Sequence, residues 1–579
     1  MPPTLGNLSA LKHLGLANND LSGPVPPETA GMSSLEHLDL TNNSPMSGGL
    51  PMGLTVLRRM DALLAGGTDL CAPADPGFRM WMARVHKSRI AACAEGDPPA
   101  AYLVQTVQSM EFPVPLIAGR RTMLRVFPTA GRATTAAIPA VRARFYRNGS
   151  ETHEVDIAGK SVPIPTEVYE GNLSTSVNAE IPTEVIQPGL EMVIEVDPDG
   201  TLDPTLGVVK RIPETGRLEL DVRVMPLFDL TLIPFIWTED PDSSVVDLVE
   251  AAVRDAENHE LLENTRTMLP VGDLSVSGHE PVLSSTNNGF TILAETRVIR
   301  VMEGGTGHYL STIARPAACV GTAELGGRVS FSHPVAITIA HELGHNLNLV
   351  HAPWCTRGEP SYPHTHGSIG VWGYDFSGGG RLVPPIHKDL MAYCGPFWVS
   401  DYHFTNALRY RLFDERAHAA SAASASEPSL LLWGGINGAE EPYLEPAFVV
   451  EAPAALPDSA GEHRVTGRTA GGDELFSFSF AMPEMADGEG RASFAFALPM
   501  QSGWAGALAT ITLAGPGGSV TLDADTDLPM AILRNPRTGQ VRGILRDMPG
   551  PGAVTAFAAG PGLEVLFSRG IPGVAAWQR

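Results

Sequence analysis

The stretch HELGHNLNLVH, residues 341–351, decides how this 579-residue sequence is interpreted. In an α-helix, side chains four residues apart lie on one face, so His341 and His345 present two imidazoles to one point. Zinc binds neutral imidazole nitrogen at about 2.0–2.1 Å and favours four ligands in a tetrahedron. His351 supplies a third imidazole, but a continuing helix would swing this position away from the other two. The chain must therefore turn sharply before His351.

Asn348 stands where that turn is needed. Glycine is the usual residue in such a turn because a positive φ is required, and asparagine is the next most tolerant. Upstream, Ser332 and Pro334 predict the start of the helix. Its packed face is predicted to consist of four apolar residues: Ile337, Ala340, Leu343 and Leu347.

Glu342 follows the first ligand and is poorly placed to join the same coordination point. It is better placed to take a proton from a zinc-bound water, whose pKa the metal lowers to about 7, and to pass it to the leaving amine. A fourth metal position left open by the protein would make such a site catalytic rather than structural. A third histidine at this offset arises by chance in only roughly one chain in a thousand, so the pattern indicates a zinc endopeptidase.

These residues resemble the metzincin clan of zinc endopeptidases, whose motif is HExxHxxGxxH followed by a methionine turn. Asn348 departs from the clan's glycine, and Asp389–Tyr393 (DLMAY) matches the methionine turn. The resemblance implies that Met391 forms an apolar floor beneath the metal. It also implies that Tyr393 lies beside the zinc and stabilises the transition state through its hydroxyl.

The segments 370–375 (GVWGYD) and 398–402 (WVSDY) are similar to segments of bacterial secreted metzincins, including the branch related to mucin-degrading proteases. This resemblance implies a protein or glycoprotein substrate, lying antiparallel to an edge strand above the cleft. Gly321–Phe331 is the candidate for that strand. A disulfide between Cys355 and Cys394 would then tie the loop after His351 to the methionine turn.

The chain is predicted to be multidomain, with an α/β (α+β) metzincin-like catalytic domain flanked by all-β sandwiches and a short leucine-rich-repeat solenoid at the N-terminus. The expected parts, in chain order, are leucine-rich repeats with a disulfide-stapled C-terminal cap, a β-sandwich, the catalytic domain, an Ala/Ser linker and a second β-sandwich. Their predicted bounds are 1–97, 98–225, 226–416, 417–429 and 430–579.

The repeats rest on Leu11, Leu14, Leu16 and Asn19, which recur 24 positions later (35 − 11) as Leu35, Leu38, Leu40 and Asn43. They resemble the plant-type leucine-rich repeat, in which leucines enter a shared core and asparagines bond backbone. A degenerate third copy runs to about Leu70. Two or three repeats cannot bury their faces alone, so we expect the tail of a longer array and a missing N-terminus. Binding of a protein or glycan and a spacer role both stay open.

Strands and helices are predicted elsewhere from periodicity. An apolar strand is expected at 227–237 and an amphipathic helix at 243–256. The other expected strands are 101–107, 122–127, 141–147, 297–301, 328–331, 475–480, 492–498 and 510–513.

Five cysteines suggest an exported protein with two local disulfides, Cys71 with Cys93 and Cys355 with Cys394, although five unrelated buried thiols remain the alternative. Cys319 is left over. Its small apolar neighbours favour an inert buried thiol over a latch or a nucleophile. We therefore predict a secreted or cell-surface location, despite the lack of a signal peptide in this sequence.

The formal net charge of −24 argues against a nucleic-acid partner, because an acidic surface repels phosphate. No run of about 18 or more apolar residues predicts a membrane span. His364 and His366 are a weaker candidate for a second metal site, and His387 and His403 are expected to be ordinary loop or packed residues. Calcium in the acidic loops stays open. The alternative function is an extracellular adhesion or carbohydrate- or protein-binding protein whose protease-like domain has lost activity.

Overall fold

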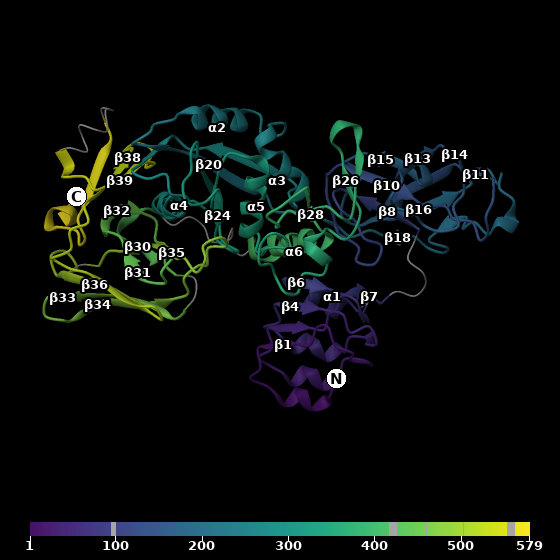
Figure 1. Ribbon diagram of the computed structural model, residues 1–579, viewed down its shortest axis with the longest axis horizontal. Coiled ribbons are helices and arrows are strands. Elements are labelled where there is room, and N and C mark those ends of the chain that lie inside the picture. Colours follow the sequence, from purple (N-terminus) through teal and green to yellow (C-terminus); the bar gives the residue numbers. More distant parts are fainter. Residues whose placement is uncertain are drawn as a thin grey trace. The chain divides into compact units, whose positions relative to one another are not determined.

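The computed structural model describes residues 1–73, 75–93, 100–415, 425–457, 460–501, 503–552 and 562–578 (Figure 1). The chain forms several domains, is rich in β-strands and has few helices. It divides into two compact units. The first consists of residues 1–226, 266–273 and 350–416, and the second of residues 227–265, 274–349 and 417–579. In the described residues, no helix is long and apolar enough to cross a membrane.

Unit 1 begins with a ladder of four short parallel strands, drawn in purple and blue in Figure 1. Their bounds are β1 His13–Gly15, β2 His37–Asp39, β4 Ala62–Leu64 and β6 Lys87–Arg89. The ladder places Leu14 beside Leu38 and Leu38 beside Leu63. Of the recurring leucines, Leu35, Leu38 and Leu40 are fully buried in one core, and Leu11, Leu14 and Leu16 pack against it, as their spacing predicts.

The helix α1, Pro76–Met82, packs into the core of this ladder through Phe78, Trp81 and Met82. Asp75 caps the helix by accepting from the backbone N–H groups of Gly77 and Phe78, which would otherwise lack partners. The predicted Cys71–Cys93 disulfide is present and ties the strand before the helix to the chain after it. The boundary predicted at residue 97 lies outside the described residues.

Residues 101–223 form several sheets that share one core, and all are antiparallel except the parallel pair of β9 Leu116–Ile117 with β19 Val222–Arg223. The largest strands of this region are β8 Ala101–Val104, β10 Thr122–Val126, β12 Val141–Arg147, β13 Ser150–Ile157, β15 Val177–Ile181 and β16 Leu190–Val196. Along β12, buried Val141, Ala143 and Phe145 alternate with more exposed basic residues. This is the alternation expected of a strand with one buried face.

The last part of unit 1 contains four short strands and the helix α6, Asp401–Tyr410. The strands are β26 Gly373–Asp375, β27 Arg381–Val383, β28 Lys388–Asp389 and β29 Phe397–Trp398. The helix α6 is attached to β6: Arg89 pairs with Asp401 at 3.0 Å, and Asn406 accepts from the backbone N–H of Ser88 at 3.2 Å. The 350–416 segment is therefore held by buried polar bonds as well as by packing.

Unit 2 is built on a nine-stranded sheet with the order β24-β25-β23-β20-β22-β39-β38-β40, with β21 also paired to β20. Its strands are β20 Phe228–Trp237, β21 Leu274–Gly278, β22 Val282–Ser284, β23 His308–Ile313, β24 Gly321–Ala323, β25 Val329–Ser332, β38 Met530–Arg534, β39 Val541–Arg546 and β40 Glu564–Ser568. The strand β24 lies at one end of this order and runs antiparallel to β25. It falls within the predicted edge segment.

Three α-helices lie wholly within the described residues of this unit: α2 Ser244–Arg254, α4 Gly289–Glu303 and α5 Ala336–Asn346; a short helix, α3 Glu263–Met268, crosses from unit 2 into unit 1. The predicted strand at 297–301 is wrong, because these residues lie inside α4. Asn288 caps the start of α4, and Gly304 ends it with φ of 65°. The run of β-branched residues imitates a strand locally, but these two end signals and packing of the apolar side chains decide for a helix.

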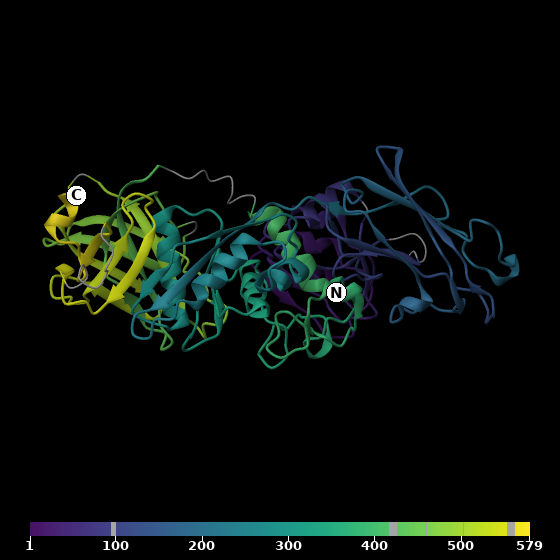
Figure 2. The same cartoon turned by 90° about the horizontal axis from the view of Figure 1, so that it is seen from above.

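The C-terminal region does not fold as a separate sandwich over 430–579. The strands β30 Glu427–Ile436, β31 Pro442–Leu444, β32 Phe448–Ala452 and β35 Ala492–Pro499 form one sheet, and β33 His463–Thr469, β34 Glu474–Phe480, β36 Leu508–Gly515 and β37 Gly518–Leu522 form another. The last three strands, yellow in Figure 2, instead extend the large sheet through the pairing of β39 with β22. Backbone pairing between segments far apart in the sequence therefore decides which sheet these strands join.

The predicted linker 417–429 needs a similar correction, because β30 already begins at Glu427. Residues 417–424 lie outside the described residues.

Candidate metal site

The helix α5 carries His341 and His345 one turn apart and ends at Asn346. Its N-cap is Val335, so neither Ser332 nor Pro334 caps it as the sequence predicts. At the other end, the N–H of Asn348 donates to the carbonyl of His345 at 2.9 Å, and the N–H of Leu349 donates to that of Gly344 at 3.1 Å. These two bonds define a Schellman motif, which needs a left-handed residue after the cap. Asn348 has φ of 62°, the positive value predicted for it.

The side chains of His341, His345, His351 and Asp487 offer ligand atoms that all lie within 4.8 Å of one another. The Nε2 atoms of His341 and His345 are 3.2 Å apart, and His345 Nε2 lies 3.4 Å from Asp487 Oδ2. Metal bonds of about 2.0–2.1 Å at tetrahedral angles place neighbouring ligand atoms about 3.3 Å apart. The donor set and these spacings therefore fit a tetrahedral ion such as zinc.

The orientation of His345 is fixed by its other ring nitrogen. His345 Nδ1 lies 2.7 Å from the carbonyl oxygen of Leu349, in the turn that follows the helix. A carbonyl can only accept, so Nδ1 carries the proton and Nε2 keeps a lone pair for a metal. The same turn that redirects the chain thus also selects the tautomer of a ligand.

Asp487 is the ligand that sequence reasoning missed. It lies 136 positions after His351 (487 − 351), in the segment between β34 and β35. Its side chain is only 11% exposed and points toward His345. No local motif surrounds it, and only the tertiary fold brings it to the cluster. The fourth ligand position, expected to be open, has a carboxylate beside it.

Glu342 is buried and its carboxyl lies against the edge strand β24. A Cβ atom added to Gly321 would stand 2.1 Å from Glu342 Oε1, so the glycine makes room for this carboxyl. Within the described part of the chain, Glu342 Oε2 has no hydrogen-bond partner. Burial, and after it the charge of Asp487, raises the pKa of Glu342 well above its usual range. A buried carboxyl whose pKa is raised in this way is a candidate for proton transfer at the site.

The methionine-turn residues lie beside the third histidine. The N–H of Ala352, the residue after His351, donates to the carbonyl of Met391 at 3.0 Å. The half-exposed ring of Tyr393 stands edge-on to the ring of His351, with centroids 4.9 Å apart. Met391 is fully buried. The predicted disulfide Cys355–Cys394 is present, and it joins the chain after His351 to this turn.

The carboxylate of Asp389 holds the methionine turn in place through hydrogen bonds. This carboxylate accepts from the backbone N–H groups of Met391 and Ser400, each at 2.8 Å, and pairs with His403 Nδ1 at 2.7 Å. Burial acts to raise its pKa, but the charge and hydrogen bonds of these partners outweigh it and lower the pKa to about 2. His403, expected to be an ordinary packed residue, is therefore the buried partner of this carboxylate.

The weaker candidates do not assemble into a second site. His364 pairs with Asp401 at 2.8 Å, whereas His366 stands against Trp354, with ring centroids 5.8 Å apart. Throughout the described ranges, the cluster around His341 is the only close group of three or more such metal-binding side chains. Cys319 is a free thiol, and burial raises its pKa to about 12, as expected of an unreactive cysteine.

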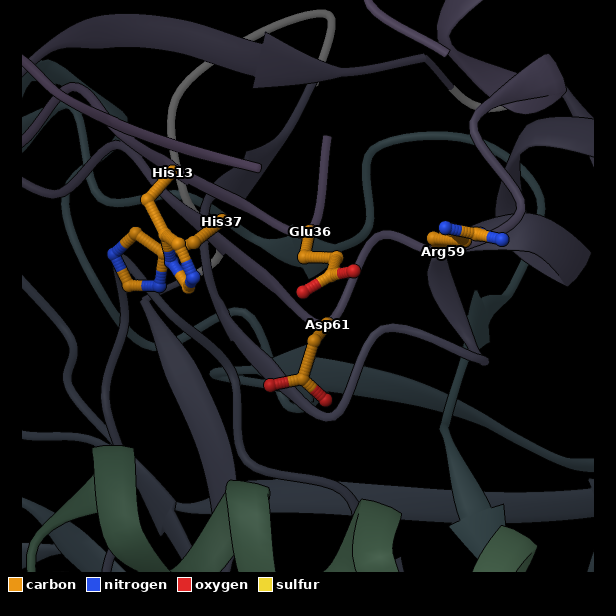
Figure 3. A pocket seen from close by; sticks show the side chains of 5 residues that line it. All are labelled: His13, Glu36, His37, Arg59 and Asp61. Carbon is orange, nitrogen blue, oxygen red and sulfur yellow. The ribbon is translucent and has the colours of Figure 1, made fainter. Parts of the chain in front are cut away.

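A separate shallow pocket lies on the ladder of unit 1, lined by His13, Glu36, His37, Arg59 and Asp61 (Figure 3). The rings of His13 and His37 lie side by side in Figure 3, with centroids 6.0 Å apart. Glu36, which lines the pocket, also forms an ion pair with Lys12 at 3.3 Å. These are ordinary surface pairs, and nothing in the pocket points to a particular ligand.

No protein-family model matches this chain. No curated protein matches it either. Among solved structures, one described as "Crystal structure of PEPR1-AtPEP1" is similar over 16% of this chain and 13% of that chain, with 26% identity and a TM-score of 0.14. The similarity spans only a small part of both chains.

Proposed function

We propose that this protein is a zinc-dependent endopeptidase acting on extracellular proteins or glycoproteins. The observation that carries the proposal is the meeting of three histidines at metal-ligand spacing, two of which share the helix α5 with the buried carboxyl of Glu342. Zinc bound there would polarise the scissile carbonyl and acidify a water molecule. The metzincin-like α/β core, the leucine-rich repeats and secretion belong to the same proposal, and the two disulfides support an extracellular setting.

In this proposal each residue has one task. His341, His345 and His351 hold the metal, and Leu349 keeps His345 in the required tautomer. Glu342 accepts a proton from the attacking water and then donates it to the leaving amine. Tyr393 lies next to His351 and presents a hydroxyl that can stabilise negative charge on the substrate. Met391 and its turn support His351 from the neighbouring loop.

One observation favours a second candidate function. A metal site closed by four protein ligands is typically structural, and Asp487 lies close enough to be the fourth. The protein would then be an extracellular binding protein in which the metal only stabilises a protease-like domain. The two candidates differ in whether a water molecule can replace Asp487.

The deciding experiment compares zinc-loaded Asp487→Ala with the double variant Asp487→Ala, Glu342→Ala. Zinc content is measured together with cleavage of casein and of mucin. We expect one zinc in each variant, and cleavage only where Glu342 is present. Equal cleavage by both variants would refute the role of Glu342. A zinc-loaded Asp487→Ala protein that cleaves neither substrate would favour the structural metal site.

A further inference from the structure

The strand β24, at one end of the large sheet, is the edge along which we expect substrate to lie. One side of β24 pairs with β25, over Gly321–Ala323 and Ser330–Ser332. Its other side faces the chain between β34 and β35, residues 481–491, called the β34–β35 loop below. All of these residues belong to unit 2.

The β34–β35 loop pairs with this second side of β24 much as a neighbouring strand would. Glu324 and Met485 form an antiparallel bridge. The N–H of Ala486 donates to the carbonyl of Ala323 at 2.9 Å, and the N–H of Leu325 donates to the carbonyl of Glu484 at 3.1 Å. A peptide that adds to an exposed strand edge uses the same backbone groups. The loop therefore occupies the positions that a bound peptide would need.

The next residue of the loop is Asp487, whose Oδ2 lies 3.4 Å from His345 Nε2. The residues that pair with β24 like a bound peptide are therefore directly followed in the chain by the carboxylate that reaches the histidine cluster. The loop is held by two features of its own sequence. Met485 is buried in the core of unit 2, and Arg491 donates to the carbonyl of Gly488 at 3.0 Å.

We propose that Asp487 is the fourth ligand of the metal site and that the β34–β35 loop blocks the substrate edge, so that the chain as described is self-inhibited. The inference rests on the proposed peptidase function. Opening requires the loop to leave β24, which removes the carboxylate and frees the strand edge together. The occupant is a segment of this chain, and a peptide substrate competes with it for the same strand edge.

Two variants separate the parts of this device. Asp487→Ala removes the carboxylate and leaves the strand pairing. Ala486→Pro removes the N–H that bonds Ala323 and leaves the carboxylate. Glu484→Ala is the matched control, because it deletes an exposed carboxylate from the same loop.

The test uses the full chain with cobalt in place of zinc, and a tripeptide hydroxamate as the probe. The visible spectrum of bound cobalt reports its ligands, and calorimetry gives the dissociation constant of the hydroxamate. Asp487→Ala is expected to change the cobalt spectrum and to lower the dissociation constant of the hydroxamate at least about tenfold. The reason is that a wild-type site open in under about a tenth of the molecules would show an apparent affinity at least about tenfold weaker than that of a fully open site. Ala486→Pro should tighten binding too, and Glu484→Ala should match the wild type.

An unchanged spectrum and unchanged hydroxamate affinity in Asp487→Ala would overturn the proposal. Peptide cleavage is measured on the same samples, with zinc restored. If Asp487→Ala changes the spectrum and binds hydroxamate tightly but cleaves no peptide, the self-inhibition stands and the peptidase function fails. If wild type and Asp487→Ala cleave casein at equal rates, the peptidase function stands and the self-inhibition fails.

Discussion

The contact between Gly321 and Glu342 provides the sharpest test of whether the Glu342 carboxyl lies against β24. Replacing Gly321 with alanine would put a methyl group 2.1 Å from Oε1, 2.7 Å from Cδ and 2.9 Å from Cγ of Glu342. Contacts below 3.0 Å essentially never occur for real Cβ atoms, so something must shift. Glu342 is only 2% exposed, so its side chain cannot turn away from the added methyl group into solvent without displacing its neighbours. Overpacking of this kind typically costs about 1–3 kcal/mol.

All three clashing atoms belong to one side chain, so the cost should vanish when that side chain is shortened. We expect Gly321→Ala to destabilise unit 2 by about 1–3 kcal/mol in the wild type but by less than about 0.5 kcal/mol in a Glu342→Ala background. Gly550→Ala is the control, because nothing lies within 4 Å of the added methyl group there.

The assay is denaturant unfolding of the four proteins of this double-mutant cycle, in the presence of a chelator so that metal binding does not contribute. Each midpoint shift is converted to a free energy with the measured slope. Destabilisation by Gly321→Ala that is equal in both backgrounds, within about 0.3–0.5 kcal/mol, would show that Glu342 does not face β24.

Three further outcomes are expected. The pKa of Asp389 is lowered to about 2 from 3.8, so this carboxylate contributes about 2 kcal/mol of stability that is complete above pH 3.8 and is lost as pH falls toward 2. The free energy of unfolding of Asp389→Asn should lack this pH dependence. Equal pH dependence of the unfolding free energy in the wild type and the variant would contradict the prediction. Cys319, with a pKa raised to about 12, should react with iodoacetamide at pH 8 about a thousandfold more slowly than free cysteine, as followed by mass spectrometry, and a rate like that of free cysteine would show an exposed thiolate. The Cys355–Cys394 disulfide closes a loop across 39 positions, so the double serine variant should lose about 4 kcal/mol of stability in unit 1; no loss in thermal unfolding would mean that packing alone holds the loop.

Much of the candidate site follows from local rules that a sequence displays. The spacing of His341 and His345 places both on one helix face, because the helical period is a property of the backbone. Asn348 marks the left-handed turn, because few residues other than glycine adopt a positive φ at low cost. The disulfides joining Cys71 to Cys93 and Cys355 to Cys394 were also predictable, since each joins cysteines that lie close together in the sequence.

Where local signals conflict, the sequence misleads. Residues 297–301 are rich in β-branched side chains, which favour a strand, yet they lie in α4, because Asn288 and Gly304 mark the ends of a helix whose apolar face packs into the core. The prediction of a separate C-terminal β-sandwich was wrong for a different reason. The strands β38, β39 and β40 join the large sheet through backbone hydrogen bonds, which carry no signature in side-chain pattern.

The sequence by itself determined the three histidines, the acid between them and the turn that brings His351 back, because these depend on contacts within eleven residues (341–351). Only the tertiary structure decided that Asp487 lies beside His345, that Gly321 gives Glu342 its space and that β24 is covered by the β34–β35 loop. These contacts join segments far apart in the chain, and they form only when the sheets of unit 2 have assembled.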